Sequence, residues 1–139
     1  MNFGSLMKKI LIIDDEYPIR EMYKSIFSSL GHEVETAKNG LDGFIKVSVF
    51  RPDGILLDVN MPEMTGPEFA KKLSEDPDPY LKNIPFIVLT GESYNDAPTQ
   101  HLFRGNTSCK AFLPKMADPD LVVRSMMAIL GSPEQEAQQ

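Results

Sequence analysis

Short apolar runs that alternate with helix-like segments are the feature that most restricts how this chain can fold. Residues 9–13, 54–58 and 85–90 are nearly continuous apolar stretches. Strands that are apolar on both faces occur in parallel sheets whose two sides are both covered. Two further strand segments, residues 33–37 and 111–114, complete the set. Five strands separated by helices predict an α/β fold, in which right-handed crossovers place helices on both faces of a doubly wound parallel sheet.

The segments between the strands carry helix start and stop signals. Pro18 suits the first turn of a helix, and Gly31 is placed to end it. Asp118 and Pro119 mark the start of the last helix in the same way. We expect helices over residues 17–30, from 41 to at least 49, over 66–74 and over 118–130.

Two stretches give other signals. Residues 76–79 (Asp-Pro-Asp-Pro) are the strongest turn signal in the sequence. Residues 91–108 contain Pro98, Gly105 and polar runs, which interrupt helical periodicity. The sequence therefore predicts a turn at the first stretch and one poor helix in the second.

The composition limits the classes of protein to which the chain can belong. A formal net charge of −6 argues against broad contact with nucleic acid, whose phosphates attract a basic surface. No stretch approaches the roughly 18 apolar residues of a membrane span, and the single cysteine excludes an intrachain disulfide. We expect one cytoplasmic domain over residues 8–130, with an N-terminal extension (1–7) and a disordered C-terminal tail (131–139).

Charged and polar residues stand where the predicted strands end. Asp14 and Asp15 follow the first strand, Asp58 ends the third, Thr90 ends the fourth and Lys115 follows the fifth. Ligands bind at the carboxyl ends of the strands in such sheets, so we expect these side chains to converge. Taken alone, an acid, hydroxyl or lysine at such a position is more often part of a solvated surface or a helix cap than of a site. Three carboxylates together repel one another, however, and favour a bound cation. Oxygen ligands without His or Cys indicate a hard ion, and Mg²⁺ fits better than Ca²⁺ because the loop lacks EF-hand spacing.

Four segments, in this order, resemble the motifs of the receiver domain of bacterial response regulators. They are ILIIDDE (10–16), LLDVNMPEMTG (56–66), IVLTG (87–91) and AFLPK (111–115). The resemblance extends over about residues 8–130. It implies the flavodoxin-like, CheY-like fold with strand order 2-1-3-4-5.

The resemblance implies a role for each residue at the strand ends. Asp58 matches the phosphoacceptor, whose carboxylate takes a phosphoryl group from a kinase phosphohistidine. Lys115 and Thr90 match the groups that hold phosphoryl oxygens, and Gly91 matches the small residue that leaves the phosphoryl pocket open. The implied Mg²⁺ ligands are Asp14 (mostly through water), Asp15, Asp58 and the main-chain carbonyl of Asn60.

The resemblance also implies residues that control the signal. Thr90 and Phe112 match the switch positions, where the hydroxyl moves toward the phosphoryl group and the aromatic ring turns inward. Because phenylalanine has no hydroxyl to keep solvated, we expect Phe112 to be inward part of the time without phosphate. Asn60 and Glu92 match sites that flank the path of hydrolytic water, and they are expected to tune dephosphorylation.

The function implied is a phosphorylation-dependent switch that stands alone. A sensor histidine kinase or phosphotransfer protein would phosphorylate it, and a downstream protein would contact the face made by the fourth helix, the fifth strand and the last helix. It would catalyse its own phosphorylation and dephosphorylation but turn over no other substrate, so it is not expected to be an enzyme. We expect no nucleic acid partner and no membrane insertion.

Three other functions are alternatives. A phosphohydrolase of the haloacid dehalogenase type needs a second acid two positions after its nucleophile, as Glu16 follows Asp14, but the hydroxyl and lysine order match less well. A flavodoxin-like flavin carrier needs a Ser/Thr/Gly-rich phosphate loop where this chain has acids. A receiver-like binding module that works without phosphorylation is less consistent with a chain that keeps all five central residues.

The chain departs from the family pattern in three places. Met116 stands where the family usually has proline, Thr65 and Pro67 replace the commoner residues around Gly66, and residues 90–115 form a longer segment than in compact members. The family's lysine-proline bond is usually cis, whereas a cis bond before an ordinary residue costs about 2.5–4 kcal/mol. We therefore expect the Lys115–Met116 bond to be trans.

Overall fold

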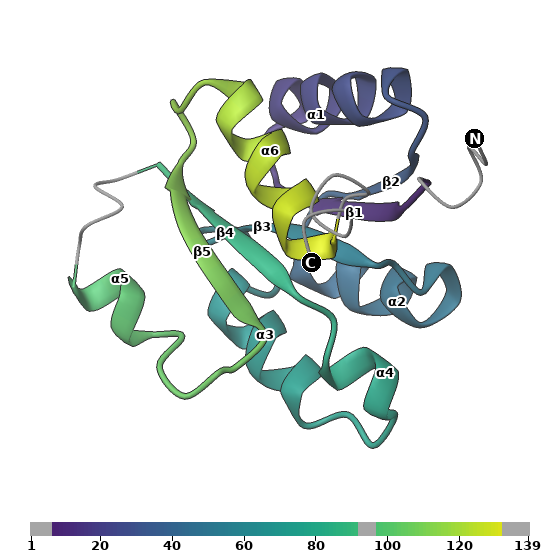
Figure 1. The fold of residues 1–139 in the computed structure, drawn as a ribbon. Helices are drawn as coiled ribbons and strands as arrows, with labels where there is room; N and C mark the ends of the chain where they lie inside the picture. Colours follow the sequence, from purple (N-terminus) through teal and green to yellow (C-terminus); the bar gives the residue numbers. More distant parts are fainter. Residues whose placement is uncertain (1–6, 92–96, 132–139) are drawn as a thin grey trace.

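One parallel sheet positions the residues at the strand ends (Figure 1). The computed structural model describes residues 7–91 and 97–131, so most of the predicted extension and tail lies outside the described residues. The strand order is β2-β1-β3-β4-β5 and all pairs are parallel, which confirms the predicted fold class. The strands are β1 (Lys9–Ile13), β2 (Glu33–Ala37), β3 (Gly54–Asp58), β4 (Phe86–Thr90) and β5 (Cys109–Pro114).

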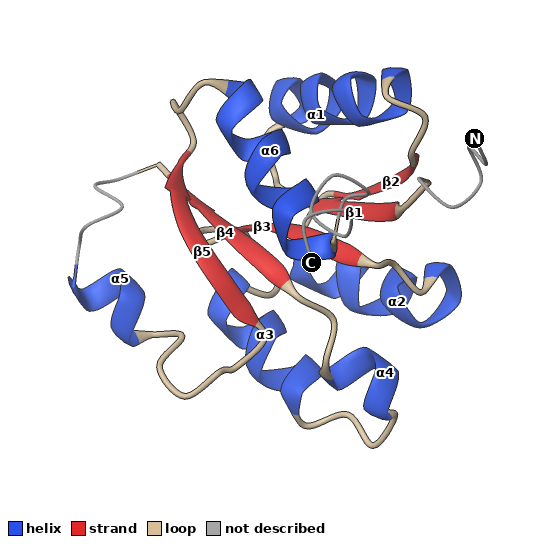
Figure 2. Cartoon of the chain, viewed as in Figure 1, coloured by secondary structure: helices blue, strands red, loops and turns tan. Residues whose placement is uncertain are grey.

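Helices cover both faces of this sheet (Figure 2). On one face lie α1 (Tyr17–Ser29) and α6 (Pro119–Leu130); on the other lie α2 (Gly40–Phe50), α3 (Gly66–Ser74) and α4 (Pro79–Lys82), while α5 (Ala97–His101) lies beside β5. Within the described part of the chain, no helix is both long and apolar enough to span a membrane.

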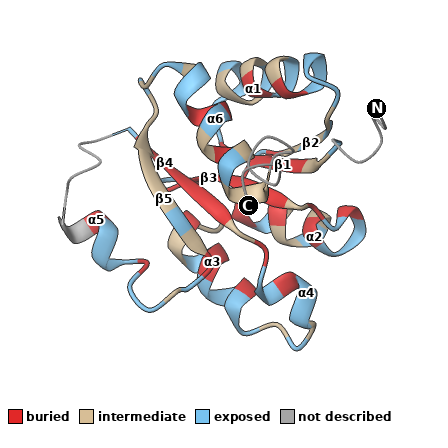
Figure 3. Cartoon of the chain, viewed as in Figure 1, coloured by how far each residue is buried: buried red, intermediate tan, exposed pale blue. Residues whose placement is uncertain are grey.

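The core is divided by the sheet into two layers. Ile10 and Ile12 of β1 pack with α1 and α6, whereas Leu11 and Ile13 belong to the layer under α2 and α3. Figure 3 shows the central strands as buried along their length. Because both faces are covered, successive residues are all apolar, and this explains the continuous runs seen in the sequence.

The short helix α4 follows the turn predicted at residues 76–79 and was not itself predicted. In that turn the Asp78 backbone N–H donates to Asp76 Oδ1 (2.8 Å). Asp78 caps α4, because its carboxylate accepts a hydrogen bond from the Tyr80 backbone N–H (2.9 Å). The Tyr80 hydroxyl donates to the Pro52 carbonyl oxygen (2.7 Å), and the Arg51 guanidinium lies 4.5 Å from the centre of the Tyr80 ring. These contacts with the segment before β3 hold one further turn of helix in place.

The C-terminal half otherwise follows the expected pattern with small shifts. The poor helix predicted within residues 91–108 is the short α5, and β5 begins at Cys109 rather than at residue 111. Because α4 is additional, the face predicted to bind partners is formed by α5, β5 and α6. The last helix begins after its N-cap Asp118 and ends before Gly131, as predicted.

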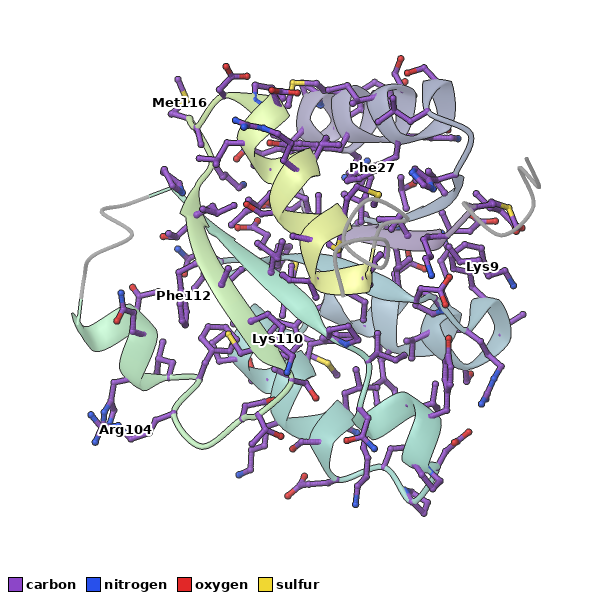
Figure 4. The ribbon with its side chains drawn as sticks, in the orientation of Figure 1. Lys9, Phe27, Arg104, Lys110, Phe112 and Met116 are labelled. Carbon is purple, nitrogen blue, oxygen red and sulfur yellow. The ribbon has the colours of Figure 1, made fainter. Side chains whose placement is uncertain are left out.

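The backbone after β5 takes the predicted trans path. No peptide bond among the described residues is cis, so the Lys115–Met116 bond is trans. The Met116 side chain extends into solvent (Figure 4). The Lys115 N–H donates to the Thr90 carbonyl oxygen (2.9 Å), which holds the two strand ends together.

His32 holds the backbone just before β1. Its Nδ1 accepts a hydrogen bond from the Lys8 backbone N–H (3.0 Å), and its ring meets the Phe27 ring edge-on with centroids 6.3 Å apart. Burial, with a smaller contribution from the Lys8 charge, lowers the pKa of His32. The neutral imidazole is the form that fits the fold, because a protonated Nδ1 has no lone pair to accept this bond.

We expect acid to destabilise the fold through His32. Its pKa in the folded chain is below the unfolded value of about 6.5, so the unfolded chain binds the proton more tightly. The stabilising contribution is complete above the unfolded pKa and is lost as the pH falls through the folded pKa. Urea unfolding at about pH 7.5 and about pH 5 should show a smaller acid-induced loss of stability in His32→Gln than in the wild type. The control His101→Gln, at an exposed histidine of α5, should behave as the wild type. Equal losses in all three proteins would refute this role.

Candidate functional site

The charged side chains predicted at the strand ends meet at the carboxyl edge of the sheet. Asp14 follows β1 and Asp58 ends β3, the two strands that flank the switch in strand order. Lys115, after β5, lies with its Nζ 3.1 Å from Asp14 Oδ1 and 3.2 Å from Asp58 Oδ2. Glu16 joins them, and we call these four residues the Lys115 cluster.

Most of the Lys115 cluster is buried. The side chains of Asp14, Asp58 and Lys115 are 2%, 4% and 10% exposed. Asp14 is also held by its backbone, because its N–H donates to the Ala37 carbonyl oxygen (3.1 Å). Removing two carboxylates from water costs free energy unless opposite charge and hydrogen bonds compensate. Lys115 supplies that charge to both.

The shared lysine does not fully compensate the two aspartates. Burial raises the pKa of Asp58 to about 7; the charge of Asp14 adds to the rise, and Lys115 opposes it. Burial likewise raises the pKa of Asp14, against a hydrogen bond from the Glu16 backbone N–H and the attraction of Lys115. Burial alone would lower the pKa of Lys115, but its hydrogen bond to Glu16 and the charges of Asp14 and Asp58 together raise it. The cluster therefore holds an excess of negative charge around one firmly protonated amine.

Glu16 is a member of the site that the sequence analysis did not assign. Its Oε1 lies 2.6 Å from Lys115 Nζ, and its side chain is half-exposed. In the sequence it served only as the second acid of the alternative phosphohydrolase pattern. The available signal was its place two residues after Asp14, on the same strand-to-helix loop. The contact with Lys115 joins residues 99 positions apart, so it depends on the fold.

The loop after Asp58 needs glycine at position 66. A β-carbon on Gly66 would collide with the Asp58 carbonyl oxygen, and the Gly66 N–H donates to the Val59 carbonyl oxygen (2.9 Å). The two departures beside it act locally. Thr65 caps α3 in a reciprocal pair with Glu68, and Pro67 occupies the first turn. Both residues thus stabilise the start of α3, directly after the loop that follows Asp58.

The acidic side chains fit a hard cation. Asp14 Oδ2 is buried and accepts no hydrogen bond within the described part of the chain. Ligand oxygens of Asp14, Asp15 and Glu16 lie within 4.8 Å of one another, and Asp15 is exposed beside them. Asp58, the third predicted carboxylate ligand, is not in that group and contacts Lys115. An unsatisfied buried carboxylate oxygen beside other carboxylates is the kind of donor set that Mg²⁺ binds.

The remaining predicted residues surround this cluster at different depths. Thr90 ends β4 and is buried, whereas Asn60 is exposed in the loop after Asp58. Apart from its chain neighbours, no described residue lies within 4 Å of the position that a β-carbon on Gly91 would occupy, so the described residues leave space beside it. Glu92 lies outside the described residues.

Phe112 lies on the α5 side of β5 (Figure 4). Its side chain is half-buried, and its ring meets Phe103 edge-on with centroids 5.6 Å apart. It thus packs against the core layer under α2 and α3 without being enclosed by it. Its inward turn on phosphorylation stays a prediction.

Comparisons with known proteins agree on the family. The sequence model of the response regulator receiver domain matches residues 10–126. Protein PilH of Pseudomonas aeruginosa is 30% identical over 126 residues, a match that covers 89% of this chain and 98% of PilH. The structure of chemotaxis protein CheY4 of Vibrio cholerae superposes with a TM-score of 0.79 at 31% identity, covering 88% of this chain and 98% of CheY4.

Other relatives are longer. Transcriptional regulatory protein CrdR of Helicobacter pylori is 34% identical over 115 residues, which are 83% of this chain but 51% of CrdR. The chain spans about half the length of this and of the next curated relatives it matches. The similarity to them is therefore to one part of each protein.

We expect Asp58→Asn to stabilise the chain when no divalent cation is present. The folded pKa of Asp58, about 7, is above its unfolded value, so ionisation of Asp58 destabilises the fold as the pH rises from about 4 to about 7. Asparagine removes that charge and leaves Lys115 paired with Asp14 and Glu16. Thermal unfolding at about pH 8 should give a Tm roughly 3–6 °C higher, near 1 kcal/mol for a chain of this size. The gain should shrink at about pH 5. The control Asp15→Asn, at an exposed carboxylate, should gain less, and a gain of the same size at both pH values would refute the argument.

Proposed function

The chain belongs to the response regulator receiver domain family, and on that basis we propose that Asp58 accepts a phosphoryl group from a histidine kinase or phosphotransfer protein. The observation that carries this proposal is the contact of Lys115 Nζ with Asp58 Oδ2 (3.2 Å) at the carboxyl edge of the sheet. Phosphoryl transfer requires mainly an aligned nucleophile and compensation of negative charge. A buried carboxylate with a lysine beside it supplies both.

The proposed reaction forms one bond to phosphorus and breaks another. A carboxylate oxygen of Asp58 forms a bond to phosphorus while the bond from phosphorus to the histidine nitrogen breaks. We propose that the Lys115 ammonium contacts the Asp58 carboxylate before the transfer and the phosphoryl oxygens after it. The hydroxyl of Thr90 is the second group proposed to contact the phosphoryl oxygens. The space that the described residues leave beside Gly91 is where the donor is proposed to enter. In dephosphorylation, a separate reaction, a water oxygen forms a bond to phosphorus while the bond from phosphorus to the Asp58 oxygen breaks, and inorganic phosphate leaves. Asn60 and Glu92 are the residues proposed to tune this step.

We assign the Mg²⁺ site to Asp14, Asp15, Asp58 and the Asn60 carbonyl. When bound, the ion would neutralise charge on the phosphoryl oxygens. Asp14 and Asp15 carry this assignment, because their carboxylates lie together and Asp14 Oδ2 is unsatisfied within the described residues. Lys115 would then be shared between Asp58 and the incoming phosphoryl group.

The output we propose is a change of protein contact. Receiver domains are signalling switches and not metabolic enzymes, and Thr90 with Phe112 is the proposed switch of this chain. Phe112 belongs to β5, so its movement would alter the face formed by α5, β5 and α6, where we place the downstream partner. We propose that the phosphoryl transfer takes place in the cytoplasm, where histidine kinases present their phosphohistidine. The proposed domain extends over residues 8–130.

Phosphorylation of Asp58 is tested directly by mass. The 139-residue chain is incubated with Mg²⁺ and acetyl phosphate, and the intact mass is measured. We expect a gain of one phosphoryl group in the wild type and none in Asp58→Ala. The control Asp120→Ala, at an exposed aspartate of α6, should gain the group as the wild type does. A wild-type chain that gains nothing, or an Asp58→Ala chain that still does, would contradict the proposal.

We expect Mg²⁺ to stabilise the chain before phosphorylation. A cation that binds only the folded state adds about 1.4 kcal/mol at ten times its dissociation constant. The wild-type Tm should rise in millimolar Mg²⁺, and Asp15→Ala should abolish most of the rise. Asp120→Ala should keep it. An unchanged wild-type Tm would contradict the proposed Mg²⁺ site, whereas the phosphorylation of Asp58 is judged separately by the intact mass.

A further inference from the structure

A groove apart from the Lys115 cluster lies between α3 and the segment that joins α5 to β5. Its volume is about 630 Å³, and its walls come from residues 67–74 and 102–108, with Lys82 and Asn83 at the end of α4. The Asn106 side chain ties the two walls together, because its Nδ2 donates to the Ala70 carbonyl oxygen (3.4 Å). Figure 3 shows that most of the segment between α5 and β5 is exposed.

The groove carries positive charge that the described residues do not pair. Lys71, Lys82 and Arg104 border it, and none forms an ion pair with any residue that the structure describes. Arg104 extends into solvent at the outer rim (Figure 4). The one acid on the border, Glu68, is held by Thr65 in the cap of α3. Three cations and one carboxylate therefore border the groove of a chain whose formal net charge is −6.

The groove also offers apolar surface. Leu102 is 59% exposed at the border of the groove, and the buried ring of Phe103 forms part of the wall. A ligand that covers Leu102 removes apolar area from water, which stabilises a complex. A ligand with charged groups and no apolar side chain would leave the surface of Leu102 exposed.

We propose that this groove docks an acidic segment of a partner protein in which apolar side chains stand between carboxylates. The carboxylates would face Lys71, Lys82 and Arg104, and an apolar side chain would cover Leu102. A protein segment fits better than nucleic acid, because three cations on an acidic chain are few for a phosphate backbone. The groove is distinct from the α5–β5–α6 face, and the proposal does not rest on phosphorylation of Asp58, so it can be tested on the unphosphorylated chain.

The test uses the unphosphorylated 139-residue chain and a labelled synthetic peptide in which leucines are interspersed among glutamates. Fluorescence anisotropy should show saturable binding that weakens as salt is added. Lys71→Glu and Lys82→Glu should each weaken binding about fivefold, because each reversal removes an attraction and adds a repulsion of the size of exposed pairs. The same peptide with glutamine at every glutamate should bind more weakly still.

The matched control is Lys24→Glu, an equal charge change at an exposed lysine of α1 on the opposite side of the sheet. It should leave the affinity unchanged. NMR shift mapping on the wild type needs no variant, and the perturbed amides should fall in residues 67–74 and 102–108. Equal weakening by Lys24→Glu, tighter binding of a single-stranded oligonucleotide, or perturbed amides confined to the α5–β5–α6 face would each overturn the proposal.

Discussion

The ammonium group of Lys115 is the point at which three strands of the sheet are joined electrostatically. It contacts Asp14 after β1 and Asp58 at the end of β3, and it is itself carried by the end of β5. Without it, two buried carboxylates would face each other with no opposite charge, a cost that burial makes large. The backbone reinforces this arrangement, because the Lys115 N–H bonds to the carbonyl oxygen of Thr90. One side chain therefore holds together the edge where ligands of such sheets bind and sets the charge available there.

The parts of the fold that burial decides could be predicted from the sequence. β1, β3 and β4 are buried along most of their length, and apolar residues satisfy that environment without a polar partner, so the apolar runs mark where these strands lie. α4 could not be predicted, because an aspartate followed by proline starts a turn and a helix equally well. The helix is stabilised by the hydrogen bond from the Tyr80 hydroxyl to the Pro52 carbonyl oxygen. Because Pro52 lies 28 residues earlier, no local sequence pattern predicts this contact.

The candidate site divides in the same way. Asp14, Asp58 and Lys115 follow from one rule, since residues after parallel strands share an edge whatever the loops do. Glu16 does not follow from it, because its position depends on where the loop after β1 directs a half-exposed side chain. Nor does the depth of Phe112, which depends on its contact with Phe103 in the segment between α5 and β5.

The ring of Phe103, which follows α5, lies between the groove and a second cavity. Phe103 borders both the cationic groove and a second cavity of about 340 Å³, and Phe112 borders that second cavity. The two rings touch edge-on, and Phe103 also meets Phe86 at the start of β4 with centroids 6.0 Å apart. Packed rings of this kind move together or leave voids, because interiors are close-packed. We infer that an inward turn of Phe112 would change its contact with Phe103, and that a ligand in the groove that holds Phe103 would oppose this turn. By thermodynamic linkage, any such effect of the groove on the switch is matched by an equal effect of the switch on affinity in the groove.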